Sequence, residues 1–154
     1  MDDRTRAATY QDVLRVAQLL YEEHVEYALI GGYALALQGI VRLTEAIDIL
    51  VEPTKDNAQR WVRALSKLPD GAARELIGDD TLHEENCAIR INDEFTVDVM
   101  NSASGFTWEQ LRDYRRKLEG ISVLSLEGLL KMKERGRLKD QADAEMIRRA
   151  LGTD

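Results

Sequence analysis

The spacing of hydrophobic and polar positions divides the chain into alternating helices and strands. Hydrophobic residues recur at helical spacing from about Ala8 to His24, and again in a segment that Thr54 caps and that ends near Leu68. Short hydrophobic runs predict strands at Val25–Ile30 and Ala46–Val51. Between these strands the pattern predicts a short helix at Tyr33–Gln38.

The second half of the chain continues the alternation. Two runs, from about Glu85 to Ile91 and from Phe95 to Met100, predict an antiparallel hairpin with its turn at Asn92-Asp93-Glu94. Thr107–Gln110 has the form of a capping box for a short helix through about Arg116. The remaining predicted elements are a loop with one helical turn at 72–82, an extended segment at Ile121–Leu124, a helix from Leu126 to about Arg135 capped by Ser125, and a last helix from about Leu138 to Leu151.

These elements predict one layered α/β unit over residues 1–154, with a core at about 25–100 and a C-terminal helical part at about 105–152. The length of 154 residues suffices to bury a sizeable core, and 44% hydrophobic with 32% charged residues is an ordinary globular composition. Hydrophobic runs are too short to span a membrane, and the charged start, MDDRTRAATY, differs from a signal peptide. We therefore expect a cytoplasmic protein without a membrane partner. Cys87 is expected to be a small core residue rather than a nucleophile.

Charge is unevenly distributed along the chain. The net charge of −7 argues against binding nucleic acid over the whole surface. Residues 1–100 contain 10 Lys and Arg against 19 Asp and Glu, whereas residues 101–154 contain 11 against 9. The basic residues of this last third form either a surface for phosphates or RNA, or ordinary solvated helix faces. The residues considered for such a surface are nine of these eleven, Arg112, Arg115, Arg116, Lys117, Lys131, Lys133, Arg135, Arg137 and Lys139.

Chemistry concentrates between Gly31 and Val51. Gly31-Gly32 would let the backbone approach an anion at the start of the following helix, although two adjacent glycines alone more often mark a turn. The presence of Asp48 on the next predicted strand favours a phosphate-binding site over a simple turn at these glycines. Residues two apart on a strand face the same side, so a strand that binds a metal pair would carry Asp-x-Asp. Here Ala46 occupies the first position, and one carboxylate is absent.

A further carboxylate, Asp98, lies in the strand of the predicted hairpin. It faces away from Phe95, Val97 and Val99. A carboxylate in an otherwise hydrophobic strand is costly to bury alone, so it requires a metal or a cation nearby. The alternative is that Asp98 is a surface residue of an edge strand.

Taken together, these motifs resemble the polymerase-β-type nucleotidyltransferase superfamily, and within it the small bacterial AbiEii/MenT-like branch, which includes toxins of toxin–antitoxin pairs. The resemblance covers roughly residues 25–150. It implies a nucleotidyltransferase fold, a small mixed sheet flanked by helices with C-terminal helices. It also implies transfer of a nucleoside monophosphate from an NTP to an acceptor hydroxyl, with release of pyrophosphate. The motifs are Gly31-Gly32-x-Ala34, Arg42-x-Thr44, Ile47–Val51, Val97-Asp98-Val99 and Ser125-Leu126-Glu127…Lys133…Arg137-x-Lys139-Asp140…Asp143.

The resemblance also implies roles for single residues. Asp48 and Asp98 would bind Mg²⁺ or Mn²⁺, and Asp98 could act as a base toward the acceptor. The nucleotide would be contacted by Gly31, Gly32, Arg42 and Thr44. Phosphate charge would be neutralised by Lys133 and Arg137. Asp140 would orient Lys139 or Arg137. Alternatively, the Lys133…Lys139-Asp140 pattern is helix-surface ion pairing, and Asp143 is expected to be structural.

Ala46 is the departure from the family pattern. Glu45 cannot replace the missing aspartate, because a neighbouring strand residue points to the opposite face. An intentional Asp-to-Ala inactivation explains a single lost residue better than the drift of a pseudoenzyme, so we expect little or no activity from this chain.

Three functions remain open. The first is a toxin that modifies RNA, above all a tRNA 3′ end, with a possible cognate antitoxin. The second is a transferase that modifies a protein, as in AMPylation, or an antibiotic. The third is a non-catalytic module that binds a nucleotide or a partner.

Overall fold

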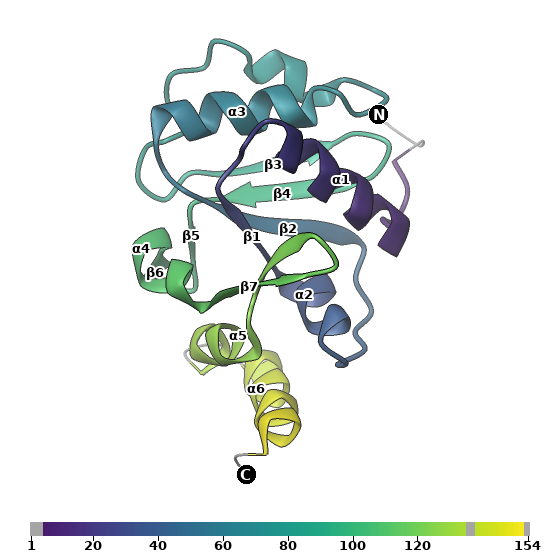
Figure 1. The fold of residues 1–154 in the computed structure, drawn as a ribbon, viewed down its shortest axis with the longest axis vertical. Helices are drawn as coiled ribbons and strands as arrows, with labels where there is room; N and C mark the ends of the chain where they lie inside the picture. The colour runs from purple at the N-terminus through teal and green to yellow at the C-terminus, as the bar shows by residue number, and fades with distance from the viewer. Residues whose placement is uncertain (1–4, 135–137, 153–154) are drawn as a thin grey trace.

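A six-stranded mixed sheet with the strand order β3-β4-β2-β1-β8-β7 organises the fold (Figure 1). The computed structural model describes residues 5–134 and 138–152. Strand β1 pairs antiparallel with β2 and parallel with β8, and β2 pairs parallel with β4. The strands are β1 (Tyr27–Ile30), β2 (Ala46–Val51), β3 (Ala88–Asn92), β4 (Thr96–Met100), β7 (Arg115–Leu118) and β8 (Ile121–Leu124), and a separate small sheet contains β5 (Ser102–Ala103) and β6 (Phe106–Thr107).

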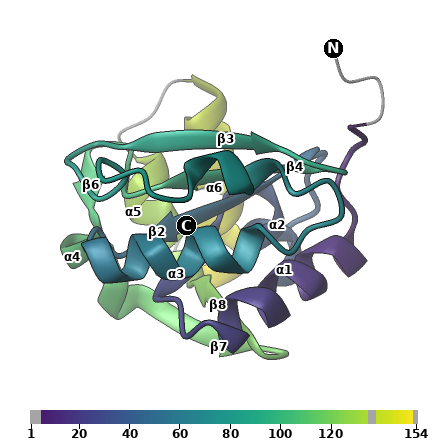
Figure 2. The same cartoon turned by 90° about the horizontal axis from the view of Figure 1, so that it is seen from above.

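Helices cover both faces of this sheet, which confirms the predicted fold class of a mixed sheet flanked by helices. Two of them, α1 (Tyr10–Glu22) and α3 (Lys55–Leu65), lie above the sheet in Figure 1, and Figure 2 shows the same two from above. Below it lie α2 (Gly31–Leu37), α5 (Leu126–Lys133) and α6 (Leu138–Leu151). The short helices are α4 (Trp108–Leu111) and the 3₁₀ turns η1 (Ala72–Leu76) and η2 (Arg112–Tyr114). No helix among the described residues combines the length and hydrophobicity needed to cross a membrane.

Hydroxyl side chains fix where several helices begin. Thr54 and Ser125 each accept a hydrogen bond from a backbone N–H in the first turn, as the sequence predicts. Thr107 forms the predicted capping box with Gln110. The first helix begins at Tyr10, slightly later than predicted, because Thr9 forms a capping box with Asp12.

The prediction of a helix from Thr107 through Arg116 is wrong. Helix α4 ends at Leu111, and residues 115–118 form β7, which pairs antiparallel with β8. Both residues of the connecting turn have positive φ, 51° at Glu119 and 81° at Gly120. Two adjacent residues with positive φ are typical of a two-residue hairpin loop. Residues 115–118 therefore pair with β8 instead of continuing the helix.

The alternating pattern of β2 and β4 divides their side chains between two environments. Ile47, Ile49, Val97 and Val99 are all buried in the core. Burying a side chain of this size stabilises the fold by about 1.5–3 kcal/mol. The intervening residues, which include Asp48 and Asp98, point to the opposite face, where α2 begins. The hydrophobic core therefore fixes the direction in which the carboxylates point.

Candidate functional site

Asp48 and Asp98 lie directly beside each other on neighbouring strands. Strands β2 and β4 are parallel, and their register places Ala46 opposite Thr96 and Asp48 opposite Asp98. Burial, the negative charge of Asp98 and a hydrogen bond to Asp98 raise the pKa of Asp48 to about 7. Asp48 therefore holds its proton at pH values below about 7. The structure thus brings together two of the predicted site residues.

The two adjacent glycines lie against this pair. Gly31 has a φ of 75°, and a side-chain carbon at this position would collide with the carboxylate of Asp48. A Cβ at Gly32 would lie 2.7 Å from the Cβ of Thr44, which is closer than real Cβ contacts. Both positions therefore require glycine for close approach, and the first also requires it for its backbone conformation. The predicted glycine, threonine and aspartate positions converge at the start of α2.

Arg90, which the sequence analysis did not select, provides the cation that Asp98 was predicted to require. It lies opposite Asp98 across the β3–β4 hairpin. Its Nε and one terminal nitrogen donate to the two carboxylate oxygens of Asp98, at 2.9 and 3.0 Å. This hydrogen-bonded pair raises the pKa of Arg90. The β3–β4 hairpin itself was predicted. Its register, which places Arg90 opposite Asp98, is the signal that could have identified Arg90.

A second cluster of charges joins the C-terminal helices to the loop before β2. The Nζ of Lys133 lies 3.0 Å from Asp140 and 3.3 Å from Asp143. Arg42 forms an ion pair with Asp143, whose side chain is only 6% exposed. Lys133 also lowers the pKa of Asp48, which places its charge within electrostatic reach of the carboxylate pair.

Several residues with predicted roles in nucleotide binding have protein partners in this cluster. Arg42 and Lys133 each form an ion pair with Asp143 of α6, so both predicted cations already have an acidic partner. Asp140 pairs with Lys133, whereas the partners predicted for it, Arg137 and the side chain of Lys139, lie outside the described residues. Thr44 donates a hydrogen bond from its hydroxyl to the backbone oxygen of Ala46, at 3.2 Å.

The carboxylate pair opens into a surface hollow of about 550 Å³. Leu43 at its rim is 99% exposed, which is unusual for a leucine. The lining mixes both signs of charge with small polar groups, and it comes from three parts of the chain. The lining residues are Thr5, Arg6 and Ala7, Leu43, Thr44, Glu45, Ala46 and Asp48, and Arg90, Thr96 and Asp98.

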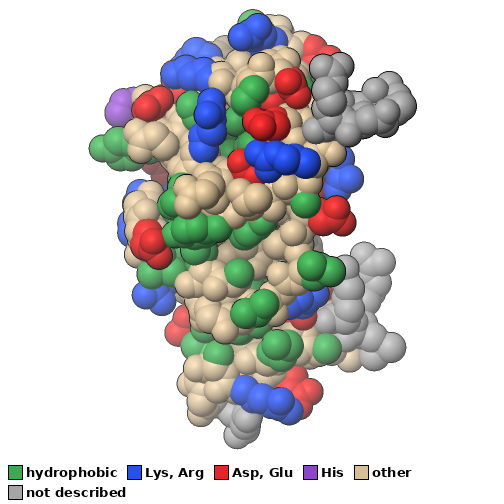
Figure 3. Space-filling model, turned by 90° about the vertical axis from the view of Figure 1, so that its right-hand side faces the viewer, with side chains coloured by type: hydrophobic (Ala, Val, Ile, Leu, Met, Phe, Trp, Pro, Cys, Tyr) green, Lys and Arg blue, Asp and Glu red, His purple; other side chains and the backbone are tan. Residues whose placement is uncertain are grey.

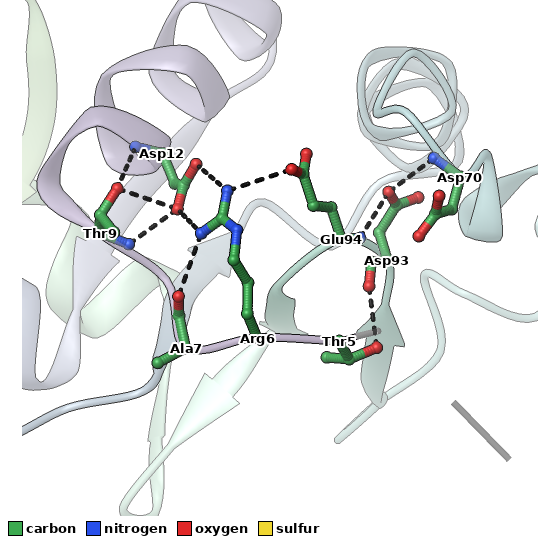
Figure 4. A network of polar contacts seen from close by, with 8 residues as sticks. All are labelled: Thr5, Arg6, Ala7, Thr9, Asp12, Asp70, Asp93 and Glu94. Atoms are coloured by element: carbon green, nitrogen blue, oxygen red, sulfur yellow. Dashed lines mark hydrogen bonds and ion pairs between the residues drawn. The ribbon is translucent and has the colours of Figure 1, made fainter. Parts of the chain in front are cut away.

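The N-terminal segment forms one wall of this hollow and is held by several contacts (Figure 4). Arg6 donates to the carboxylate of Asp12 at 2.6 and 3.1 Å and forms an ion pair with Glu94 at 3.4 Å. The Thr5 hydroxyl donates to the backbone oxygen of Asp93. Asp93 is fully buried, and its carboxylate accepts backbone N–H groups of Asp70 and Ala72. The wall is therefore anchored to helix α1 and to the turn between β3 and β4.

A divalent cation fits the two carboxylates, but a metal pair does not. The raised pKa of Asp48 shows that burial and the neighbouring charge of Asp98 disfavour its ionised form, which a cation at the pair would stabilise. Mg²⁺ is commonly held by one or two carboxylates together with substrate phosphates. Glu45 lines the hollow, yet the described residues contain no group of three or more acidic, His or Cys side chains placed to hold a metal. With Ala46 two residues before Asp48, strand β2 offers one carboxylate to this face.

The basic residues of the last third do not form one surface. Arg112, Arg115, Arg116 and Lys117 line a separate hollow of about 690 Å³. In that hollow the Arg115 guanidinium lies 4.8 Å from the centre of the Trp108 ring and 3.0 Å from Glu26. Lys133 belongs instead to the cluster on α6, so the predicted RNA surface is divided.

Figure 3 shows the molecule from the right-hand side of Figure 1. Acidic and basic side chains adjoin near the upper end of this face and again near its lower end, and hydrophobic side chains are scattered over the whole face. A mixture of both signs produces no extended field of one charge. Electrostatic attraction to a large anion is therefore not a property of this whole face.

The chain has a structural neighbour that matches it over nearly all of its length. It is the protein TM1012 of Thermotoga maritima, whose crystal structure is described as that of a "putative nucleotidyltransferase". The two structures superimpose with a TM-score of 0.54 over 96% of this chain and 98% of the other, at 20% sequence identity. At this identity the comparison shows a shared fold, that of a protein described as a nucleotidyltransferase. No family model matches the sequence, and no curated protein matches it. The nucleotidyltransferase fold agrees with the resemblance of its motifs, while the AbiEii/MenT-like branch stays a prediction.

Proposed function

We propose that this fold serves as a metal-dependent nucleotidyltransferase, which transfers a nucleoside monophosphate from an NTP to an acceptor hydroxyl. The observation that carries the proposal is the pair Asp48 and Asp98, held in register on parallel strands with Gly31 packed against it. In the reaction the acceptor oxygen bonds to the α-phosphorus, the bond to the β-phosphate breaks, and pyrophosphate leaves. A divalent cation at the carboxylates would neutralise charge on the phosphates during this exchange.

The residues of this chain would bind and orient the reactants. Gly31 and Gly32 would admit the phosphates close to the backbone. Asp98 would accept the proton of the acceptor hydroxyl. Lys133 would contribute positive charge near the phosphates, since its charge already acts on Asp48.

The chain itself would have little or no activity, because Ala46 supplies no oxygen where the pattern requires one. Ala46 lines the hollow and lies two residues from Asp48, on the same face of β2. An aspartate at this position would point at the same space as the existing carboxylates. Asp-to-Ala inactivation of a toxic enzyme accounts for such an isolated loss.

RNA, above all a tRNA 3′ end, is the acceptor we favour, which would make the active form a toxin with a possible antitoxin partner. The hollow lined by Arg112, Arg115, Arg116 and Lys117 supports this choice, because arginine and lysine bind phosphates. Binding of RNA there would weaken steeply with salt concentration. A protein or small-molecule acceptor would not show this dependence.

The test compares the chain as given with Ala46→Asp and Ala46→Asn. Each is incubated with Mg²⁺, α-labelled NTPs, tRNA and a protein extract. The proposal predicts label transfer by Ala46→Asp alone, because Asn matches the size of Asp without its charge. Label on tRNA supports the toxin, and label on protein identifies the alternative acceptor class. Absence of label with all three folded proteins, the unchanged chain and the two variants, would instead indicate a non-catalytic binding module.

A further inference from the structure

The contact between Arg90 and Asp98 uses both oxygens that a metal ion would need. The two N–H···O distances, 2.9 and 3.0 Å, are those of a forked pair with one nitrogen on each oxygen. Arg90 remains 66% exposed, whereas Asp98 is only 19% exposed. The guanidinium therefore covers Asp98 from the solvent side, which is the side that opens into the hollow.

The backbone fixes this contact, because Arg90 and Asp98 are cross-strand partners in the β3–β4 hairpin. Arg90 also acts on the neighbouring carboxylate, since its positive charge lowers the pKa of Asp48. A cation that approaches the pair thus meets a positive charge already in contact with Asp98. Two cations at one carboxylate repel each other, so one must leave.

We propose that Arg90 is the internal counter-ion of Asp98, that a divalent cation must displace it, and that the displaced guanidinium then binds the phosphates of the incoming nucleotide. The nucleotide part rests on the proposed function, while the competition at Asp98 does not. Phosphate oxygens accept the same forked pair of N–H groups as a carboxylate. A triphosphate in the hollow would therefore give Arg90 a new partner.

One consequence is positive coupling between the cation and the nucleotide. When the cation binds alone, it separates Arg90 from Asp98 and leaves the guanidinium without a new partner. When phosphates are present, the contact is replaced, so each ligand strengthens the binding of the other. A purely structural role of Arg90 on the sheet surface would produce no such coupling.

The test measures Mn²⁺ binding by electron paramagnetic resonance at pH 8, where Asp48 is ionised. The variants are Arg90→Gln, Arg90→Lys and the control Arg63→Gln, whose native arginine pairs with Glu23 on the helical side of the molecule. Without nucleotide, Arg90→Gln is expected to bind Mn²⁺ about tenfold more tightly than the unchanged chain. Its affinity for the Mn²⁺–ATP complex should fall by about tenfold. Arg63→Gln should match the unchanged chain in both measurements.

Arg90→Lys keeps the positive charge, but one ammonium group cannot donate to both oxygens in the forked geometry of a guanidinium. Its Mn²⁺ affinity should therefore lie between those of the unchanged chain and Arg90→Gln. This variant also gives the comparison if Arg90→Gln fails to fold. The proposal is overturned if the Arg90 variants bind Mn²⁺ no more tightly than the unchanged chain, or if none of the proteins binds it.

The outcome is separate from that of the proposed function. Transfer by Ala46→Asp together with unchanged Mn²⁺ binding in the Arg90 variants would refute the counter-ion and leave the transferase intact. Tighter Mn²⁺ binding in Arg90→Gln without transfer by Ala46→Asp would support the counter-ion and refute the transferase.

Discussion

Asp48 and Asp98 occupy matched positions on the parallel strands β2 and β4, and burial together with the charge of Asp98 raises the pKa of Asp48 to about 7. A carboxyl group whose pKa is raised by folding binds its proton more tightly in the folded state. Its ionisation therefore costs stability as pH rises from the ordinary value of 3.8 through about 7. In the absence of a bound cation, the loss of folding stability is therefore fully developed at alkaline pH.

Asp48→Asn should stabilise the chain at pH 8, because it removes a negative charge that is unfavourable beside Asp98. We expect Tm to rise by about 3 °C or more at pH 8 and by less at pH 5, where Asp48 is already protonated. Thermal unfolding without divalent cations measures both values. Asp113→Asn, at a side chain that is 92% exposed, serves as the control. Equal shifts at the two pH values would contradict the raised pKa.

Gly31→Ala should destabilise the fold more than Gly39→Ala. Both positions have positive φ, 75° and 96°, so an added methyl group is strained in each. At Gly39 no heavy atom lies within 4 Å of the added carbon, whereas at Gly31 it would meet the carboxylate of Asp48. We expect a loss of about 1–2 kcal/mol in the free energy of unfolding for Gly39→Ala, and at least about 1 kcal/mol more for Gly31→Ala. Urea denaturation measures both, and similar losses would disprove close packing at Gly31.

Lys133→Met should weaken the junction between α5 and α6, because it removes a cation from Asp140 and Asp143. Lys133 is only 18% exposed, and loss of one partner leaves acidic groups partly buried without compensation. We expect a loss of about 2–3 kcal/mol in the free energy of unfolding, below the full cost of a deeply buried pair. Arg149→Ala, which removes an exposed pair with Glu145, should cost about 0.3–0.5 kcal/mol. Equal effects in urea denaturation would show that the cluster is an ordinary surface feature.

Much of the fold and part of the candidate site can be predicted from the sequence. Asp48 and Asp98 were found because each interrupts a hydrophobic strand, and strand parity fixes which face each occupies. Arg90 was missed because its pairing depends on the register of the hairpin, which the pattern of one strand does not contain. Strand β7 was missed because a short run of arginine and lysine has no strand periodicity, although Glu119-Gly120 could have indicated the turn.

The N-terminal wall of the hollow has a practical consequence for handling this protein. Arg6 and Ala8 donate backbone N–H groups to Glu94 and Glu45, so the segment lies across the ends of β2 and β4. A bulky group attached at Thr5 would lie beside the candidate site and perturb that wall. Purification handles, fluorophores and immobilisation linkers are therefore better attached after α6, whose last residue is Leu151.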